Sequence, residues 1–246
     1  MSMFIGFPFE DRIEILTDGA VYLPNGYLVF TERKVHCSPD VPAAITGRGN
    51  RHTVERMTEA CLSYFRDYGF RGGMIAIEQE FDQWRAIGYQ GLPFQLYIAG
   101  YDEERGPCQF TVSSHPDVMH KGAEAMRINT LLGVAYAAPP LDQEEVSAFL
   151  NEERLAKGCS DFGPELCQYL RGRTDYVIDD PEKRQIHIVG GHIDLTTVAK
   201  EGASTRRLLT WPDLPLEFID PTLQPVMEPR PTTPIAPAEA GQMADA

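Results

Sequence analysis

The stretch Ser2–Gly49 decides the fold, and it reads SMFIGFPFEDRIEILTDGAVYLPNGYLVFTERKVHCSPDVPAAITGRG. Short apolar runs rich in β-branched and aromatic residues alternate there with turn-forming dipeptides, a pattern typical of strands joined by tight turns. Asp18-Gly19 and Asn25-Gly26 supply two of these turns, because glycine adopts a positive φ without steric cost. The stretch therefore predicts consecutive antiparallel strands at the start of the chain.

Three polar residues lie at equal intervals in this stretch. Ser2, Asp18 and Lys34 are each separated from the next by 16 residues. If three adjacent strands of one sheet carry them, a hydroxyl, a carboxylate and an ammonium group meet at one end of that sheet. Taken singly, each has a commoner interpretation: a start-site residue, a turn residue and a solvated surface lysine. The spacing makes the three together candidate catalytic residues.

The sequence around these residues resembles a proteasome β-type subunit of the N-terminal-nucleophile (Ntn) hydrolase superfamily. The motifs that carry the resemblance are Ser2-Met3-Phe4-Ile5-Gly6, Leu16-Thr17-Asp18-Gly19, Lys34-Val35 and Ile45-Thr46-Gly47-Arg48-Gly49. That family places its nucleophile, usually Thr, its acid and its lysine at this same spacing. The resemblance covers about residues 2–200 and implies that Ser2 is the nucleophile, exposed when Met1 is removed.

The chemistry of such a site explains why these residue types are needed. A free α-amine has a pKa near ~8, so the amine of Ser2 can take the proton of its own hydroxyl. The cation of Lys34 lowers both the pKa of that amine and the cost of forming the alkoxide. Asp18 keeps the lysine charged and oriented. A backbone N–H of the Gly47–Gly49 turn, that of Gly49, can hold the oxyanion.

We therefore expect hydrolysis of an amide or peptide bond by an N-terminal Ser, with no metal and no organic cofactor. The resemblance implies an α+β fold, a four-layer αββα sandwich of two antiparallel sheets between helix layers. Periodicity alone indicates only mixed α and β structure with antiparallel strands. We expect one such domain over residues 1–220, followed by a flexible Pro/Ala-rich tail over residues 221–246 that is too poor in apolar residues to fold alone.

Several local elements are predicted outside the N-terminal stretch. A helix begins after the N-cap Asn50 and stops at Gly69, and a second helix covers about residues 74–84. Residues 94–102 and 109–114 form a hairpin. Asp142 and Glu145 make a capping box for a further helix, another covers residues 165–170 after Pro164, residues 184–189 pair with residues 192–198, and residues 206–211 form a last strand.

The middle of the chain departs from the family pattern. The family carries a Gly-Ser-Gly turn where this chain has Ile128–Gly133, and a supporting Asp and Ser where it has Ile186 and Val189. Asn129 or Thr130 is a candidate replacement. These departures support an alternative function, a catalytically silent structural or assembly protein on the same scaffold, for example a shell or phage-particle component. An amidase acting on small amides is a third possibility.

Two histidine groups invite a metal interpretation. His115 and His120 share a loop with Asp117, but a third ligand cannot be named. His187 and His192 are separated by an odd number of residues, so on one strand they point to opposite faces. We expect structural roles for these histidines and for Asp194.

Composition excludes several classes of function. The 246 residues are 43% hydrophobic, enough for one sizeable domain, and the net charge of −14 argues against nucleic acid or an anionic membrane as a partner. No long apolar window or signal peptide is predicted. The five cysteines form no CxxC pair and indicate reduced thiols in a cytoplasmic protein. The resemblance implies self-association into rings or stacked oligomers, a peptide or small-amide substrate, and room for a separate ATPase or assembly partner.

Overall fold

The computed structural model of the chain describes residues 3–23, 25–115, 124–176, 182 and 184–229. Among these residues the fold is mostly β, with 36% in strands and 30% in helices. Every strand pairing made by the described residues is antiparallel. None of the helices in this part of the chain combines the length and the apolar character needed to span a membrane.

The larger sheet has six strands in the order β10-β1-β2-β13-β14-β15. Its strands are β1 (Phe4–Pro8), β2 (Arg12–Asp18), β10 (Ala135–Ala137), β13 (His192–Ala199), β14 (Gly202–Thr210) and β15 (Val226–Met227). β2 lies between β1 and β13, with Thr17 opposite Phe4 on one side and opposite Asp194 on the other. The carboxyl end of β2, at Asp18, is therefore enclosed by neighbouring strands.

The second large sheet has five strands in the order β5-β6-β7-β8-β9. These are β5 (His36–Cys37), β6 (Ala43–Gly49), β7 (Phe94–Asp102), β8 (Gly106–Ser113) and β9 (Asn129–Leu131). β7 and β8 are the predicted hairpin, which is confirmed. The register places Arg48 opposite Gln95 and Gly49 opposite Phe94 at the end of β6.

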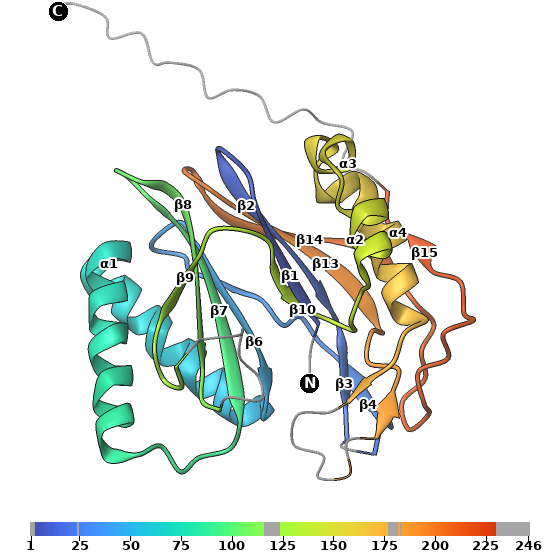
Figure 1. Ribbon diagram of the computed structural model, residues 1–246, viewed down its shortest axis with the longest axis horizontal. Coiled ribbons are helices and arrows are strands. Elements are labelled where there is room, and N and C mark those ends of the chain that lie inside the picture. The colour runs from blue at the N-terminus through green and yellow to red at the C-terminus, as the bar shows by residue number, and fades with distance from the viewer. Residues whose placement is uncertain (1–2, 24, 116–123, 177–181, 183, 230–246) are drawn as a thin grey trace, which may run out of the picture.

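Two further sheets contain two strands each. β3 (Ala20–Tyr22) pairs with β4 (Leu28–Thr31), and β11 (Asp175–Tyr176) pairs with β12 (Gln185–Ile186). Both lie at the same end of the molecule (Figure 1). The predicted pairing of residues 184–189 with residues 192–198 is wrong, because β13 pairs with β2 and β14 instead.

A long helix, α1 (Arg51–Ile87), covers the outer face of the five-stranded sheet (Figure 1). The Asn50 side chain accepts a hydrogen bond from the Thr53 N–H, so the predicted N-cap is confirmed. Gly69 has φ 68° and ψ 179°, which are not helical values, and it divides α1 by a kink. The predicted break is therefore confirmed at this glycine, where two helices meet, and the second of them contains the predicted residues 74–84.

The other helices are α2 (Gln143–Phe149), α3 (Glu152–Lys157) and α4 (Cys159–Arg171). They lie beside the six-stranded sheet (Figure 1). The capping box of Asp142 and Glu145 is present at the start of α2, as predicted. The sequence did not predict α3, and α4 begins six residues earlier than the predicted 165–170, so Pro164 lies inside it.

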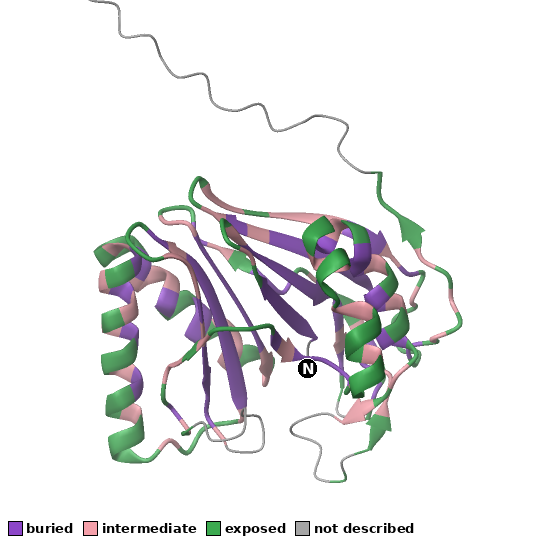
Figure 2. Cartoon of the chain, turned by 45° about the horizontal axis from the view of Figure 1, so that its top comes forward, coloured by how far each residue is buried: buried purple, intermediate pink, exposed green. Residues whose placement is uncertain are grey.

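Buried residues form three apolar clusters, and Figure 2 shows them concentrated on the strands and on the inner helix faces. One cluster lies between α4 and the six-stranded sheet, and a second lies between α1 and the five-stranded sheet. The third joins the two sheets, where the rings of Phe4 and Tyr97 stack with their centroids 5.2 Å apart. β2 contributes Leu16 to the first cluster and Ile15 to the third, as strand alternation requires.

The prediction of a four-layer αββα sandwich is wrong. Within the described residues the strands form four separate sheets rather than two. There, α2 and α3 bury none of their residues, so no complete helix layer covers the six-stranded sheet. The extra sheets arise because the chain leaves β2 at Asp18 and pairs β3 with β4 alone. At the other end, β15 pairs with β14 within the stretch expected to be a tail, whose residues 230–246 lie outside the described part.

Candidate functional site

A buried ion pair joins two of the residues that the sequence singles out. Lys34 Nζ donates to Asp18 Oδ1 over 2.9 Å, and the two side chains are 6% and 0% exposed. Lys34 also donates to the carbonyl oxygen of Ala20. Asp18 ends β2, whereas Lys34 follows β4 in a different sheet, so the pair is not formed on adjacent strands of one sheet as the spacing suggested.

The carboxylate of Asp18 also fixes the backbone around it. Its Oδ1 accepts the N–H of Met3 over 2.8 Å, and its Oδ2 accepts the N–H of Ala20 over 3.1 Å. One side chain thus connects the start of β1, the start of β3 and the ammonium group of Lys34. Three donors on one carboxylate give a well-defined geometry at the point where the described chain begins.

Burial lowers the pKa of Lys34 below that of an exposed lysine, and the neighbouring Asp18 carboxylate opposes this effect. The ammonium group therefore has little access to solvent but keeps an anionic partner. Such a group acts strongly on any titratable neighbour, because water screens it poorly.

Ser2 and Met1 lie outside the described residues. The fourth predicted site residue, Gly49, ends β6 with φ 114°, a conformation that favours glycine. A Cβ atom at this position would lie 2.2 Å from the Pro93 carbonyl oxygen, so the close approach also requires glycine. Gly47, Gly49 and Lys34 line one pocket, and the structure thus brings the predicted lysine and the predicted oxyanion-binding turn to the same cavity.

The same pocket carries several charged side chains. Glu32 and Glu55 both bind Arg51, which lies at the start of α1. Arg33 lies beside Lys34 in the chain, and its Nε is 3.4 Å from Asp194 Oδ2. The pocket is therefore polar and cationic on the side of Lys34.

Asp194 is the centre of a second cluster of charged side chains, which Arg33 connects with the pocket. Arg207 Nε lies 3.1 Å from Asp194 Oδ1, and His192 Nε2 lies 3.4 Å from Oδ2. Burial alone would raise the pKa of Asp194, but His192 and Arg207 outweigh it and lower that pKa to about 2. Because Arg33 also reaches this carboxylate, the cluster connects β13 and β14 with the segment that carries Lys34.

The loop that supports Gly19 is held by a buried arginine. Gly19 donates its N–H to the Gly190 carbonyl oxygen over 3.1 Å, and Gly191 donates its N–H to Asp213 Oδ2 over 2.6 Å. Arg171, which is fully buried in α4, binds both carboxylate oxygens of Asp213. It also donates to the carbonyl oxygens of Val189 and Asp220.

Sequence reasoning did not single out Arg171 or Asp213. A signal was present, because Arg171 lies one residue after Leu170 and four after Cys167, on the helix face that packs into the core. An arginine at such a position needs an anionic partner. The sequence alone does not identify that partner, which lies 42 residues further along the chain.

The positions where the family carries polar supports are apolar in the structure as well. Val189 is fully buried, and Ile186 packs against the same cluster as α4. The candidate replacements Asn129 and Thr130 lie in β9 at the edge of the five-stranded sheet, and the Asn129 side chain donates to the Arg127 carbonyl oxygen. Neither replacement therefore bonds to the Asp18–Lys34 pair.

The histidines and cysteines offer no competing centre in the described chain. His115 contacts Ser114, His187 contacts the Arg173 carbonyl oxygen, and Asp117 and His120 lie outside the described residues. No group of three potential metal ligands is found within residues that the structure describes. The cysteines are free thiols, and burial raises the pKa of Cys61 to about 12, which disfavours a thiolate nucleophile there.

Neither a scan against models of known protein families nor a search of the curated proteins found a match for this chain.

Proposed function

We propose that the chain is an Ntn hydrolase related to proteasome β-type subunits, which cleaves an amide or peptide bond with Ser2. The observation that carries the proposal is the buried Asp18–Lys34 pair, bonded through Asp18 to the N–H of Met3. Met3 is the residue that follows Ser2. Consecutive Cα atoms lie about 3.8 Å apart, so the covalent chain keeps Ser2 within one peptide unit of this hydrogen bond.

Burying the Asp18–Lys34 ion pair costs free energy, so its presence needs a physical reason. Removing two charges from water costs several kcal/mol per ion, and apolar residues of similar volume often stabilise a fold as well or better. A structural sheet end has no physical need for a desolvated ammonium group. A nucleophile with its own amine as base does, because the cation favours both the neutral amine and the alkoxide.

The proposed reaction follows from these roles. Removal of Met1 frees the α-amine of Ser2, and Ser2 Oγ attacks the amide carbonyl while its proton passes to that amine, directly or through water. The Gly49 N–H holds the oxyanion of the tetrahedral intermediate. The intermediate collapses to an ester on Ser2, and the leaving amine takes the proton. Water then hydrolyses the ester and regenerates the hydroxyl.

Assembly into rings or stacked oligomers belongs to the same proposal, as does a peptide or small-amide substrate. A second candidate is a catalytically silent assembly protein. The apolar Ile186 and Val189 favour it, because they pack in the core and leave the nucleophile without two of the family's polar supports. The two candidates differ in whether Met1 is removed, since a blocked amine cannot act as the base.

Intact-mass spectrometry after incubation with a β-lactone electrophile tests the proposal. We expect a protein without Met1 that carries one adduct, mapped to the N-terminal peptide. Ser2→Ala abolishes the adduct, whereas Ser147→Ala, which removes an exposed helix hydroxyl, leaves it unchanged. Retained Met1 with no adduct would favour the silent assembly protein.

A further inference from the structure

The pocket beside Lys34 has the opposite charge balance to the rest of the chain. Four cations line it, Arg33, Lys34, Arg48 and Arg51, against the two carboxylates Glu32 and Glu55. The whole chain carries a net charge of −14. Whether such a pocket prefers anionic ligands depends on which of its cations is left without a carboxylate.

Three of the four cations already have anionic partners. Lys34 binds Asp18, and Arg33 reaches Asp194. Arg51 binds both pocket carboxylates, with 2.9 Å contacts to both oxygens of Glu32 and a 2.7 Å contact to Glu55. No carboxylate of the lining is left for Arg48.

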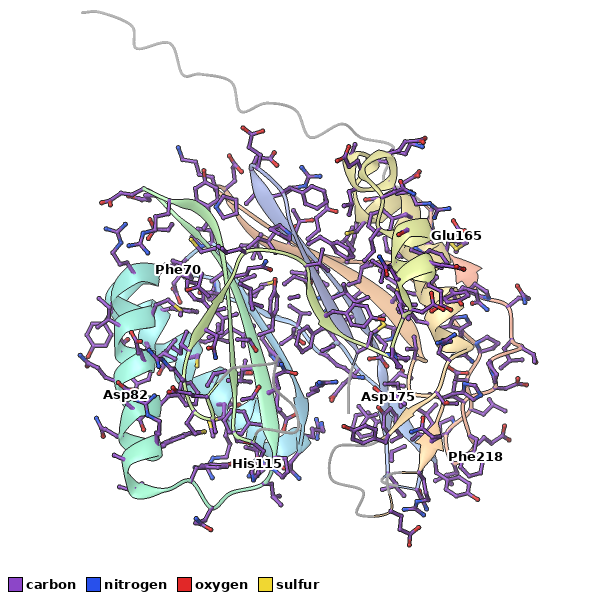
Figure 3. The ribbon with its side chains drawn as sticks, in the orientation of Figure 1. Phe70, Asp82, His115, Glu165, Asp175 and Phe218 are labelled. Atoms are coloured by element: carbon purple, nitrogen blue, oxygen red, sulfur yellow. The ribbon has the colours of Figure 1, made fainter. Side chains whose placement is uncertain are left out.

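Arg48 is the exception. Its Nε donates to the neutral Gln95 Oε1 over 2.7 Å, and its Nη atoms make no ion pair or hydrogen bond with the described residues. The carboxylate of Asp175, in β11 (Figure 3), opposes the effect of burial on the pKa of Arg48 but forms no ion pair with it among the described side chains. Arg48 and Asp175 are both half-buried, and this partial burial lowers the pKa of Arg48 and raises that of Asp175.

We infer that this pocket binds a carboxylate on the acyl part of the substrate through the Nη atoms of Arg48. A guanidinium presents parallel N–H groups that match the two oxygens of a carboxylate. A ligand of this class supplies the anion that the pocket lacks. An apolar or cationic acyl group would instead leave the Nη atoms of Arg48 without an anionic partner.

The proposed carboxylate contact at Arg48 lies beside the residues proposed for catalysis. Lys34 and Gly49 line the same pocket as Arg48, and Arg48 is adjacent to Gly49 in β6. An acyl group whose carboxylate lies on Arg48 would therefore present its carbonyl near the proposed nucleophile and oxyanion site. The cleavage step rests on the proposed function, but the binding preference does not.

Turnover of matched substrates gives the first test. We would compare peptide aminocoumarin amides that differ only in the acyl residue: Glu, its neutral isostere Gln, Leu and Lys. We expect kcat/KM for Glu to exceed that for Gln about tenfold, which corresponds to about 1.4 kcal/mol. Arg48→Met removes this preference, and Arg66→Met, which removes an exposed arginine of α1, retains it. Equal rates for Glu and Gln, or a preference that survives Arg48→Met, would overturn the inference.

A binding measurement separates this inference from the proposed function. In the Ser2→Ala protein we would titrate N-acetylglutamate α-amide and N-acetylglutamine α-amide and follow the thermal unfolding midpoint. We expect the charged compound to bind about tenfold more tightly than the neutral one. This affinity ratio should fall toward one in Arg48→Met. In Arg48→Lys it should be intermediate, because lysine keeps the charge but not the two parallel N–H groups of a guanidinium. Tighter binding of the charged compound, with no substrate turnover and no β-lactone adduct, would refute the proposed hydrolase function but not the carboxylate-binding pocket. No discrimination, or no binding of either compound, would refute the pocket.

Discussion

The ammonium group of Lys34 and the carboxylate of Asp18 form a 2.9 Å ion pair in which neither side chain is more than 6% exposed. The pair connects the end of β2 with the segment between β4 and β5 and, through Asp18, holds the backbone at Met3 and Ala20. It therefore organises both the local fold and the proposed site.

Replacing Lys34 by Met should leave the Asp18 carboxylate buried without its cation. We expect a loss of about 3 kcal/mol in the free energy of unfolding, measured by urea denaturation. The double variant Asp18→Asn/Lys34→Met should lose less than the sum of its single variants, because the two groups are coupled. Lys200→Met, at an exposed position, should stay within about 0.5 kcal/mol of wild type. Equal effects at Lys34 and Lys200 would contradict the geometry.

Gly19 has no room for a side chain. A Cβ atom there would lie 2.2 Å from the His192 ring. Gly19→Ala should displace this ring and destabilise the protein by about 1–3 kcal/mol. Adding Gly19→Ala to His192→Ala should cost less unfolding free energy than adding it to wild type, because the clashing ring is absent. Unfolding curves of wild type, the two single variants and the double variant would show this difference. A Gly19→Ala protein as stable as wild type would exclude the contact.

Arg171 should not tolerate a conservative replacement. Lysine cannot reproduce the bidentate contact with Asp213 together with the bonds to two carbonyl oxygens. We expect Arg171→Lys to cost about 3 kcal/mol in unfolding free energy. The matched control is Arg154→Lys, in an exposed pair with Glu165, which should cost less than about 1 kcal/mol. Similar losses in the two variants would show that the buried arrangement is not formed.

Asp194 should make the free energy of unfolding depend on pH in the acidic range. His192 and Arg207 hold its pKa at about 2 against the opposing effect of burial, below the value of about 3.9 for an unfolded chain. A lowered pKa in the folded state stabilises it above the unfolded pKa, and this stabilisation is lost as the pH falls from about 4 toward 2.

The contribution of Asp194 should be about 2 kcal/mol above pH 4. Urea denaturation of wild type and Asp194→Asn at pH 6 and at pH 2.5 measures it. The difference between the two proteins should shrink on going to the lower pH. A difference that does not change with pH would assign the effect of the substitution to packing and not to charge.

The elements that the sequence predicted well depend on local chemistry. Asn50 caps α1 through an N–H three residues away, Gly69 breaks that helix with its own φ, and the capping box at Asp142 spans one turn. The pairing of β7 with β8 follows from a short turn between alternating strands. Each of these features is decided within a few residues, so a single sequence contains the information.

The remaining features depend on contacts between distant segments. β11 and β12 contain two residues each, too few for a periodic pattern, and their pairing is a tertiary contact. The separation of β3 and β4 from the sheet of β2 also follows from tertiary packing, which is why two sheets were predicted and four are found. In the site, equal spacing indicated Asp18 and Lys34, whereas the partners of Arg171 and the unpaired position of Arg48 required coordinates.

The central claim is that the buried cation activates a nucleophile at the start of the chain. The most direct measurement is the rate at which a β-lactone labels the N-terminal peptide, followed by intact-mass spectrometry in wild type, Lys34→Met, Ser2→Ala and Lys200→Met. We predict one adduct on Ser2 in wild type and Lys200→Met, at least about 100-fold slower labelling in Lys34→Met, and none in Ser2→Ala. Labelling of folded Lys34→Met at the wild-type rate, or an adduct that persists in Ser2→Ala, would contradict the claim.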